Sequence, residues 1–255
     1  MLKKYLFLFY FAGIGISCSN STAEHKSVSA DTAIAQNKPL FKDFMGINGH
    51  VTFKPDLYKQ ACRLVRSYHN MPWDVKRPGD PFTFPMTVNK INWQKDVYGP
   101  WKKAGFETDI CLQFMSFGAP ARGYQQLWAG REQWAYDYGK AAAAYFGPSG
   151  KEKLCTSFEI GNEPGRRFDK TLFRTLFKKM AEGIRDGDPM AKIVTPAVTA
   201  GKEDDYSQGL DMYGDKDILP LYDVINLHTY ATLEKSFGDD NTWNRSYPED
   251  KSLQY

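Results

Sequence analysis

The sequence predicts an α/β fold of the TIM (β/α)8 type, with about six of the eight βα units present. Short apolar or β-branched runs alternate with helical stretches from residue 41 onward, which is typical of parallel strands joined by helical crossovers. The turn after the first run lacks the G-x-G-x-x-G spacing of a dinucleotide-binding sheet. Polar residues follow the strand ends, as they do at the mouth of a barrel.

Six short segments have the composition of buried strands. Each is rich in apolar or β-branched residues and is separated from the next by a loop or a helical stretch. In chain order, the predicted strands are Phe44–Gly49, Cys62–Tyr68, Thr108–Phe114, Cys155–Gly161, Lys192–Ala197 and Asp223–His228.

The clearest predicted helix lies at Asp169–Asp186, where apolar residues recur at steps of three and four and form one stripe. A second helix is predicted over Arg131–Phe146, closed by the breaker "FGPSG". Shorter helical pieces are expected at Pro55–Ala61 and Trp93–Ala104. Trp101 and Trp134 lie on such stretches, and we expect both to be packing residues.

The charge pattern argues against a nucleic-acid partner. The chain has 33 Lys and Arg against 30 Asp and Glu, a net charge of +3, and the two signs are mixed along the sequence. Aromatic residues make up 15% of the chain, which suits either a large core or a site that stacks flat apolar faces. No cofactor is expected.

The first 18 residues have the pattern of an export signal. A basic start at Lys3 and Lys4 precedes an apolar run, residues 5–16, that is short for a membrane span. The run closes on small residues and Cys18, and "GISC" resembles the lipobox of bacterial lipoproteins. The resemblance implies a lipid anchor on Cys18 and a place in the bacterial cell envelope. Gly15 stands where Leu is usual, so a soluble secreted form remains an alternative.

Residues 19–40 are expected to be a flexible tether, because their Ser-, Thr-, Ala- and Gln-rich composition has too little apolar content to fold. The domain then spans residues 41–255. It contains Cys62, Cys111 and Cys155, an odd number with no zinc-ligand spacing. Each lies in or beside an apolar segment, so we expect buried free thiols.

The fourth predicted strand ends in "FEIGNEP". The proline after Glu163 favours extended backbone at the glutamate and cannot continue a strand ladder, so the carboxylate should lie at the rim of the sheet. Asn162 supplies an amide able to donate or accept at a sugar hydroxyl. Hydrolysis of a glycosidic bond requires one carboxylic acid at the leaving oxygen and a second carboxylate. Glu163 suits the first role.

"FEIGNEP" resembles the fourth-strand signature of the clan A retaining glycoside hydrolases, which are (β/α)8 enzymes. The resemblance implies that Glu163 is the general acid/base and that Asn162 contacts the hydroxyl next to the anomeric carbon. "RLVRSYH" resembles the second strand of the clan, which implies that Arg66 keeps the nucleophile ionised. "NLHTY" resembles the sixth strand, which implies that His228 lines the sugar site and Tyr230 reaches toward the nucleophile.

Weaker candidates for substrate contacts follow strand ends or lie in loops on the side where a sugar would enter. They are His50, His69, Trp73, Trp128 and Trp243. The two histidines are equally consistent with a structural role at a strand end. Glu159 shares strand parity with Glu163, and we expect it to form a structural ion pair with a nearby arginine.

The resemblance implies a nucleophilic glutamate at the end of a seventh strand, about 5 Å from Glu163. The polar stretch after Tyr230 contains no apolar run that ends in such a residue. We therefore expect an incomplete domain, with the nucleophile on a missing C-terminal part and with little activity in these 255 residues alone.

Two other functions remain open from the sequence. A non-catalytic carbohydrate-binding lipoprotein, or an inactive fragment, would need no nucleophile. A metal-dependent hydrolase would use His50, His69 and His228, although the His-x-His pair usual on the first strand of such barrels is lacking. The expected partner is a polysaccharide or oligosaccharide. The polymer is not identified, since the clan covers cellulose, mannan, xylan, galactan and agar-like chains.

Overall fold

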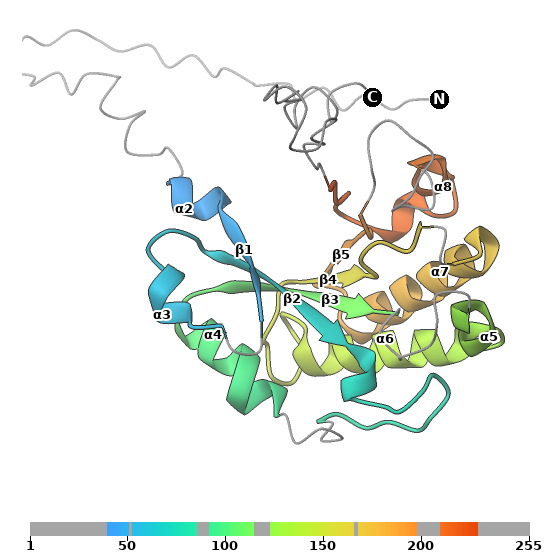
Figure 1. Ribbon diagram of the computed structural model, residues 1–255, viewed down its shortest axis with the longest axis horizontal. Coiled ribbons are helices and arrows are strands. Elements are labelled where there is room, and N and C mark those ends of the chain that lie inside the picture. Colours follow the sequence, from blue (N-terminus) through green and yellow to red (C-terminus); the bar gives the residue numbers. More distant parts are fainter. Residues whose placement is uncertain are drawn as a thin grey trace, which may run out of the picture. The chain divides into compact units, whose positions relative to one another are not determined.

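Five parallel strands form the core of the described part of the protein. The computed structural model describes residues 40–50, 53–85, 92–114, 123–165, 168–197 and 210–228. Within these residues a single sheet is flanked by helices (Figure 1). Its strands are β1 (Gly46–Gly49), β2 (Leu64–Asn70), β3 (Glu107–Gln113), β4 (Ser157–Ile160) and β5 (Lys192–Val194).

The strand order identifies the type of α/β fold. The order in the sheet is β1-β2-β3-β4-β5, and each strand pairs in parallel with the next one along the chain. A doubly wound sheet reverses its order at a switch point, whereas consecutive units of a (β/α)8 barrel do not. The predicted partial barrel is therefore confirmed for the described residues.

Three helices cover one face of the sheet: α4 (Gly99–Lys103), α6 (Glu132–Phe146) and α7 (Lys170–Gly187). Helices α6 and α7 pack directly against each other (Figure 1). A Cβ at Gly183 would lie only 2.1 Å from the carbonyl oxygen of Tyr136, so the close approach of the two helices depends on this glycine.

Helix α7 forms where the apolar stripe predicts it. The Asp169 side chain accepts a hydrogen bond from the backbone N–H of Leu172 at 2.9 Å and caps the first turn. The stripe is buried against the sheet and α6. The buried stripe residues are Phe173, Leu176, Phe177, Met180 and Ile184.

The shorter α-helices of the described part are α2 (Phe41–Phe44), α3 (Pro55–Tyr58), α5 (Tyr124–Trp128) and α8 (Leu210–Gly214). The single helix predicted over residues 93–104 is a π-helical turn, Trp93–Tyr98, followed directly by α4. The turn and α4 bury Trp93, Tyr98 and Trp101 in the core. Burial confirms the predicted packing role of Trp101, and the partly buried Trp134 packs against the same core.

Side chains of β2 alternate between the two faces of the sheet. Those at odd positions are buried on the helix-covered face: Val65, Ser67 and His69. Those at even positions lie on the opposite face, which is the barrel interior: Leu64, Arg66, Tyr68 and Asn70. The interior face contains a groove of about 430 Å³, with Arg66 and Asp109 in its lining.

Five of the six predicted strands are confirmed, with ends displaced by a few residues. The sixth prediction, over residues 223–228, is wrong as a full strand. Here Val224 forms one parallel bridge with Val194, and its carbonyl oxygen accepts a hydrogen bond from Thr195 N at 2.9 Å. The three cysteines are buried and free, as predicted.

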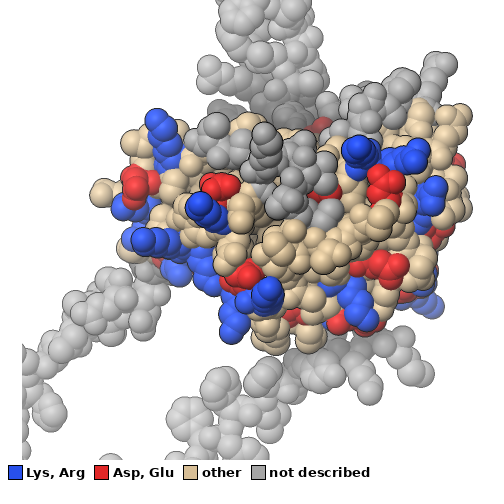
Figure 2. Space-filling model, turned by 90° about the horizontal axis from the view of Figure 1, so that it is seen from below, with Lys and Arg blue, Asp and Glu red and all other residues tan. Residues whose placement is uncertain are grey.

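Basic and acidic side chains are interspersed on the face of the molecule shown in Figure 2. This agrees with the mixed charges of the sequence. No helix in the described ranges is both long enough and apolar enough to cross a bilayer.

Candidate active site

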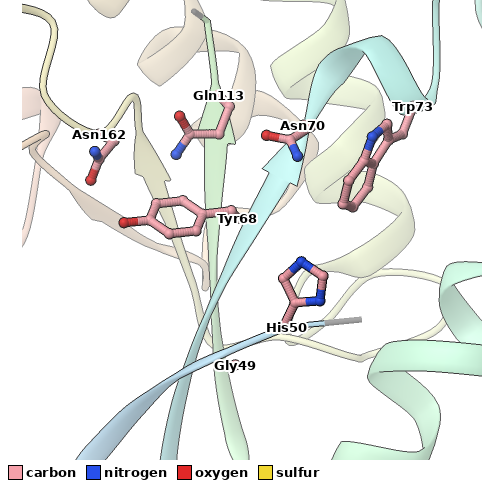
Figure 3. Close-up of a pocket in the computed structure, with 7 residues that line it drawn as sticks. All are labelled: Gly49, His50, Tyr68, Asn70, Trp73, Gln113 and Asn162. Atoms are coloured by element: carbon pink, nitrogen blue, oxygen red, sulfur yellow. The ribbon is translucent and has the colours of Figure 1, made fainter. Parts of the chain in front are cut away.

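A pocket of about 280 Å³ opens at the carboxyl ends of the strands, where the sites of parallel barrels are built. Residues from β1, β2 and β3 and from the segments that follow β1, β2 and β4 line it (Figure 3). The lining residues are Gly49, His50, Tyr68, Asn70, Trp73, Gln113 and Asn162. The structure thus brings together three residues predicted separately, His50, Trp73 and Asn162.

The pocket lining combines aromatic rings with neutral amides. Tyr68 and Trp73 supply the rings, and Asn70, Gln113 and Asn162 supply the amides (Figure 3). Amides both donate and accept hydrogen bonds, and flat rings stack on the apolar faces of sugars. These are the groups expected for a neutral polyhydroxylated ligand.

The sequence interpretation missed Tyr68 and Gln113 in the pocket. Asn70 and Gln113 are register partners in neighbouring strands, and Tyr68 lies two residues before Asn70 on the same face. Tyr68 could have been identified from the sequence, because it lies two residues after Arg66 on the same strand and therefore faces the same side of the sheet. The place of Gln113 in the pocket depends on the register of β3 against β2, which the sequence does not reveal.

Asn162 is oriented by Arg66. The Nη2 group of Arg66 donates to Asn162 Oδ1 at 2.7 Å, so the amide can offer its NH₂ group to a ligand. The carbonyl oxygen of Asn162 also accepts from the backbone N–H of Ala197 at 2.6 Å. These two bonds tie the end of β4 to β2 and to the segment after β5.

Glu163 follows a left-handed turn at the end of β4. Gly161 has a φ of 83°, a conformation that favours glycine, and its N–H still bonds to the carbonyl oxygen of Leu112. This turn ends the regular alternation before Glu163 is reached. Oε1 of Glu163 lies 2.6 Å from Nδ1 of His228, and the two side chains are only 20% and 16% exposed.

Glu159 forms the predicted ion pair with an arginine, and that arginine is Arg66. Nε and Nη2 of Arg66 lie 2.5 Å and 2.8 Å from the two carboxylate oxygens, and the Glu159 side chain is 1% exposed. Burial raises the pKa of Glu159 to about 7, although Arg66 acts in the opposite direction. Burial by itself lowers the pKa of Arg66, but Glu159, together with Cys111 and Tyr68, produces a net upward shift. Within the described residues, Glu159 is therefore the carboxylate that Arg66 holds.

Asn226 connects this ion pair with the rim. Its Nδ2 group donates to Oε1 of Glu159 at 3.0 Å and lies 3.4 Å from Nε2 of His228. Its backbone N–H bonds to Oγ1 of Thr195 at 3.0 Å. The sequence interpretation did not single out Asn226, although it has the same parity as His228 in the predicted sixth strand.

The predicted substrate contact of His69 is wrong. His69 lies at an odd position of β2 and is fully buried on the helix-covered face. Its Nδ1 lies 2.9 Å from the hydroxyl of Tyr98, and its Nε2 lies 2.6 Å from Oδ2 of Asp74. Burial raises the pKa of Asp74, but the charge and hydrogen bond of His69, with hydrogen bonds from Tyr138 and Trp93, produce a net lowering. This cluster is part of the core.

Trp128 is also placed differently from its prediction as a loop platform. It lies at the end of α5 and is fully buried. Its indole N–H donates to the carbonyl oxygen of Phe114 at 3.1 Å, and the two rings pack with centroids 4.7 Å apart. A buried ring offers no face to a sugar, so Trp128 is a packing residue.

The histidines of the metal-dependent alternative do not meet at one place. His50 lines the pocket, His69 is enclosed with Asp74, and His228 contacts Glu163. Among the described residues, no group of three or more His, Cys, Asp or Glu side chains has a metal-binding arrangement. The predicted anchor Cys18 and the site candidates Tyr230 and Trp243 lie outside the described residues.

No family model matches the sequence, and no curated protein matches it either. Solved structures with similar folds include an endoglucanase of Pseudomonas stutzeri, with 14% identity and a TM-score of 0.43, covering 58% of this chain and 46% of that one. An endo-β-1,4-mannanase of Thermotoga petrophila has 14% identity and a TM-score of 0.45, and the match covers 64% of this chain and 45% of the mannanase. A family 39 glycoside hydrolase of Bacteroides cellulosilyticus has 15% identity and a TM-score of 0.42, and the match covers 59% of this chain and 31% of that hydrolase. The matched part thus spans less than half of each of these three proteins.

Proposed function

We propose that the protein is a retaining glycoside hydrolase acting on O-glycosidic bonds of a polysaccharide or oligosaccharide, with Glu163 as general acid/base. The observation that carries this proposal is the position of Glu163. Its carboxylate lies just past the carboxyl end of β4, beside pocket residue Asn162, and His228 holds it at 2.6 Å. A general acid needs this combination of a rim position, an adjoining ligand pocket and a fixed orientation.

The pocket supports a sugar as the ligand. In this proposal Trp73 stacks on a sugar ring, and His50 and the NH₂ group of Asn162 bond to its hydroxyls. Arg66 acts through Asn162, which it orients at 2.7 Å. His228 holds Glu163 at 2.6 Å, and in this proposal it lines the sugar site beside that carboxylate.

The retaining mechanism also needs a nucleophilic carboxylate about 5 Å from the acid. The seven residues that line the pocket include no Asp or Glu. Glu159 is already enclosed by Arg66 and Asn226. We therefore propose that the nucleophile comes from outside the described residues.

A non-catalytic carbohydrate-binding function is the second candidate. The observation in its favour is the same lining of rings and amides without a carboxylate among the described residues. Such a protein would keep Trp73 and Asn162 as its principal ligand contacts. Glu163 would then have a structural role, as a hydrogen-bond partner of His228.

Binding and turnover separate the two candidates. Calorimetric titrations with oligosaccharides of cellulose, mannan, xylan, galactan and agar test binding to residues 1–255, and release of reducing ends tests turnover. Either function predicts binding of at least one class and its retention in Glu163→Gln. An enzyme additionally predicts that any turnover proceeds with retention of anomeric configuration and is abolished in Glu163→Gln. An exposed carboxylate on β3 supplies the control, Glu107→Gln.

Absence of binding to all five classes contradicts both candidates. Turnover that survives Glu163→Gln contradicts the role of Glu163. We also propose that the protein is exported as a cell-envelope lipoprotein anchored through Cys18; Cys18→Ala should then release it from the membrane fraction of the producing bacterium.

A further inference from the structure

Asn226 lies between the two glutamates of the site. On one side is Glu159, buried and paired with Arg66, and on the other is His228, which contacts Glu163 at the rim. The distances are 3.0 Å from Asn226 Nδ2 to Glu159 Oε1 and 3.4 Å from the same Nδ2 to His228 Nε2. One amide NH₂ group therefore faces both neighbours.

The buried ion pair determines which way the amide of Asn226 points. An ionised carboxylate only accepts hydrogen bonds, so the group that faces Glu159 must be the NH₂ donor and not the carbonyl oxygen. Arg66 fixes the carboxylate through two bonds, and Asp109 and Cys111 on β3 are the other titratable groups that act on it. The bond from the backbone N–H of Asn226 to Thr195 holds the amide in place.

The orientation of this amide has a consequence for His228. An NH₂ group only donates hydrogen bonds, so an Nε2 atom that accepts from it carries no proton. The ring proton then resides on Nδ1, which lies 2.6 Å from Oε1 of Glu163. His228 donates this proton in a hydrogen bond to the carboxylate.

We propose that Asn226 is a positioning residue that fixes His228 in its Nδ1–H tautomer and thereby holds the carboxylate of Glu163 in place. In this proposal the Arg66–Glu159 ion pair orients the amide of Asn226, and Asn226 fixes the tautomer of His228. His228 in turn holds the carboxylate of Glu163. A second-sphere partner that selects the tautomer of a histidine is a general device in protein sites. The importance of this arrangement for catalysis rests on the proposed function, but the tautomer itself does not.

His69 provides an internal contrast in the same molecule. Its Nε2 faces Oδ2 of Asp74 at 2.6 Å, so the geometry requires the proton on Nε2. Asp74 has a lowered pKa and is an acceptor at neutral pH. The Nε2 atoms of the two histidines are therefore expected to differ, with a proton on Nε2 of His69 and none on Nε2 of His228.

Long-range ¹H–¹⁵N correlation spectra of ¹⁵N-labelled protein report which ring nitrogen carries the proton. The chain has only four histidines, so single His→Gln variants assign every signal. The spectra are recorded at pH 8, where Glu159, with its pKa of about 7, is ionised. We expect His228 to show a protonated Nδ1 and an unprotonated Nε2, and His69 to show a protonated Nε2. A wild-type His228 with an unprotonated Nδ1 overturns the proposal without any variant.

Two substitutions test the dependence on Asn226. Asn226→Asp places a carboxylate near Nε2, so His228 should gain a proton on that nitrogen. Asn226→Leu removes the donor, so the single-tautomer pattern should be lost. Unchanged His69 signals show that either variant has kept its fold. Persistence of the wild-type His228 pattern in both folded variants contradicts the proposal.

Failure of this inference and failure of the proposed function are distinguishable. The spectra require neither sugar nor turnover, so they report only on the tautomer of His228. If no oligosaccharide binds while His228 is Nδ1–H, the proposed function fails and the positioning role of Asn226 stands. If Glu163→Gln abolishes retaining turnover while His228 is Nε2–H, the proposed function stands and the positioning role of Asn226 fails.

Discussion

Arg66 on β2 and Glu159 on β4 form a two-bond ion pair across the intervening strand β3, with distances of 2.5 Å and 2.8 Å. The pair lies on the interior face of the sheet, directly beneath the candidate site. From it, Arg66 orients Asn162 and Glu159 orients Asn226. The polar residues at the rim thus depend on one buried charge pair.

Glu159→Gln is expected to change how stability depends on pH. The pKa of Glu159 is about 7 in the folded state against 4.5 in the unfolded chain, so the folded protein binds more protons between these values. The wild type therefore loses about 3 kcal/mol of stability from this group as pH rises from about 4.5 to 7, with the full contribution present only below that window. Urea unfolding at a series of pH values should show the free energy of unfolding of Glu159→Gln rising relative to that of the wild type by this amount over the same pH range. The exposed control Glu107→Gln should follow the wild-type curve; a constant difference for Glu159→Gln would contradict the shift.

Arg66→Met is expected to destabilise the protein strongly at pH 8. The substitution leaves the ionised Glu159 buried without its cation, which costs about 3–5 kcal/mol. At pH 5 the loss should be smaller, since Glu159 is then protonated. A double-mutant cycle with Glu159→Gln measures the coupling between the two side chains. Equal losses at both pH values would show that the charge of Glu159 is not the cause.

Gly183→Ala is expected to disrupt the packing of α6 on α7. Alanine improves helix propensity by about 1 kcal/mol, but its Cβ would lie 2.1 Å from the carbonyl oxygen of Tyr136. The helices must separate, and overpacking of this kind costs about 1–3 kcal/mol. Thermal unfolding measures the loss. Gly214→Ala in α8 is the matched control, because no atom lies within 4 Å of a Cβ there and stability should hold or rise.

Two tryptophans should respond to substitution in different ways. Trp73 lines the pocket, so Trp73→Ala should weaken oligosaccharide binding about tenfold, or roughly 1.4 kcal/mol. Trp128 is fully buried, so Trp128→Ala should lower stability by about 3–5 kcal/mol and leave the affinity of the folded protein unchanged. Calorimetric titration and thermal unfolding of both variants distinguish these effects. A selective loss of affinity in folded Trp128→Ala would restore its role as a platform.

The sequence by itself determined those features that depend on local periodicity. The apolar stripe of α7 follows from a repeat of 3.6 residues, and the strands are visible as short apolar or β-branched runs. The order of these elements identified the barrel type. The proline after Glu163 predicted a carboxylate at the end of β4, because it affects only its own backbone and that of its neighbour. The pairing of Glu159 with an arginine followed from the high cost of a buried lone charge.

Only the tertiary structure decided which distant side chains meet. Gln113 reaches the pocket through the register of β3 against β2, and Asn226 reaches Glu159 although 67 positions separate them in the chain. His69 and Trp128 were predicted as site residues but lie in the core. Strand parity places His69 on the buried face of β2, and the packing of α5 buries Trp128. The physical reason is that register and packing are set by contacts between elements, whereas periodicity describes each element separately.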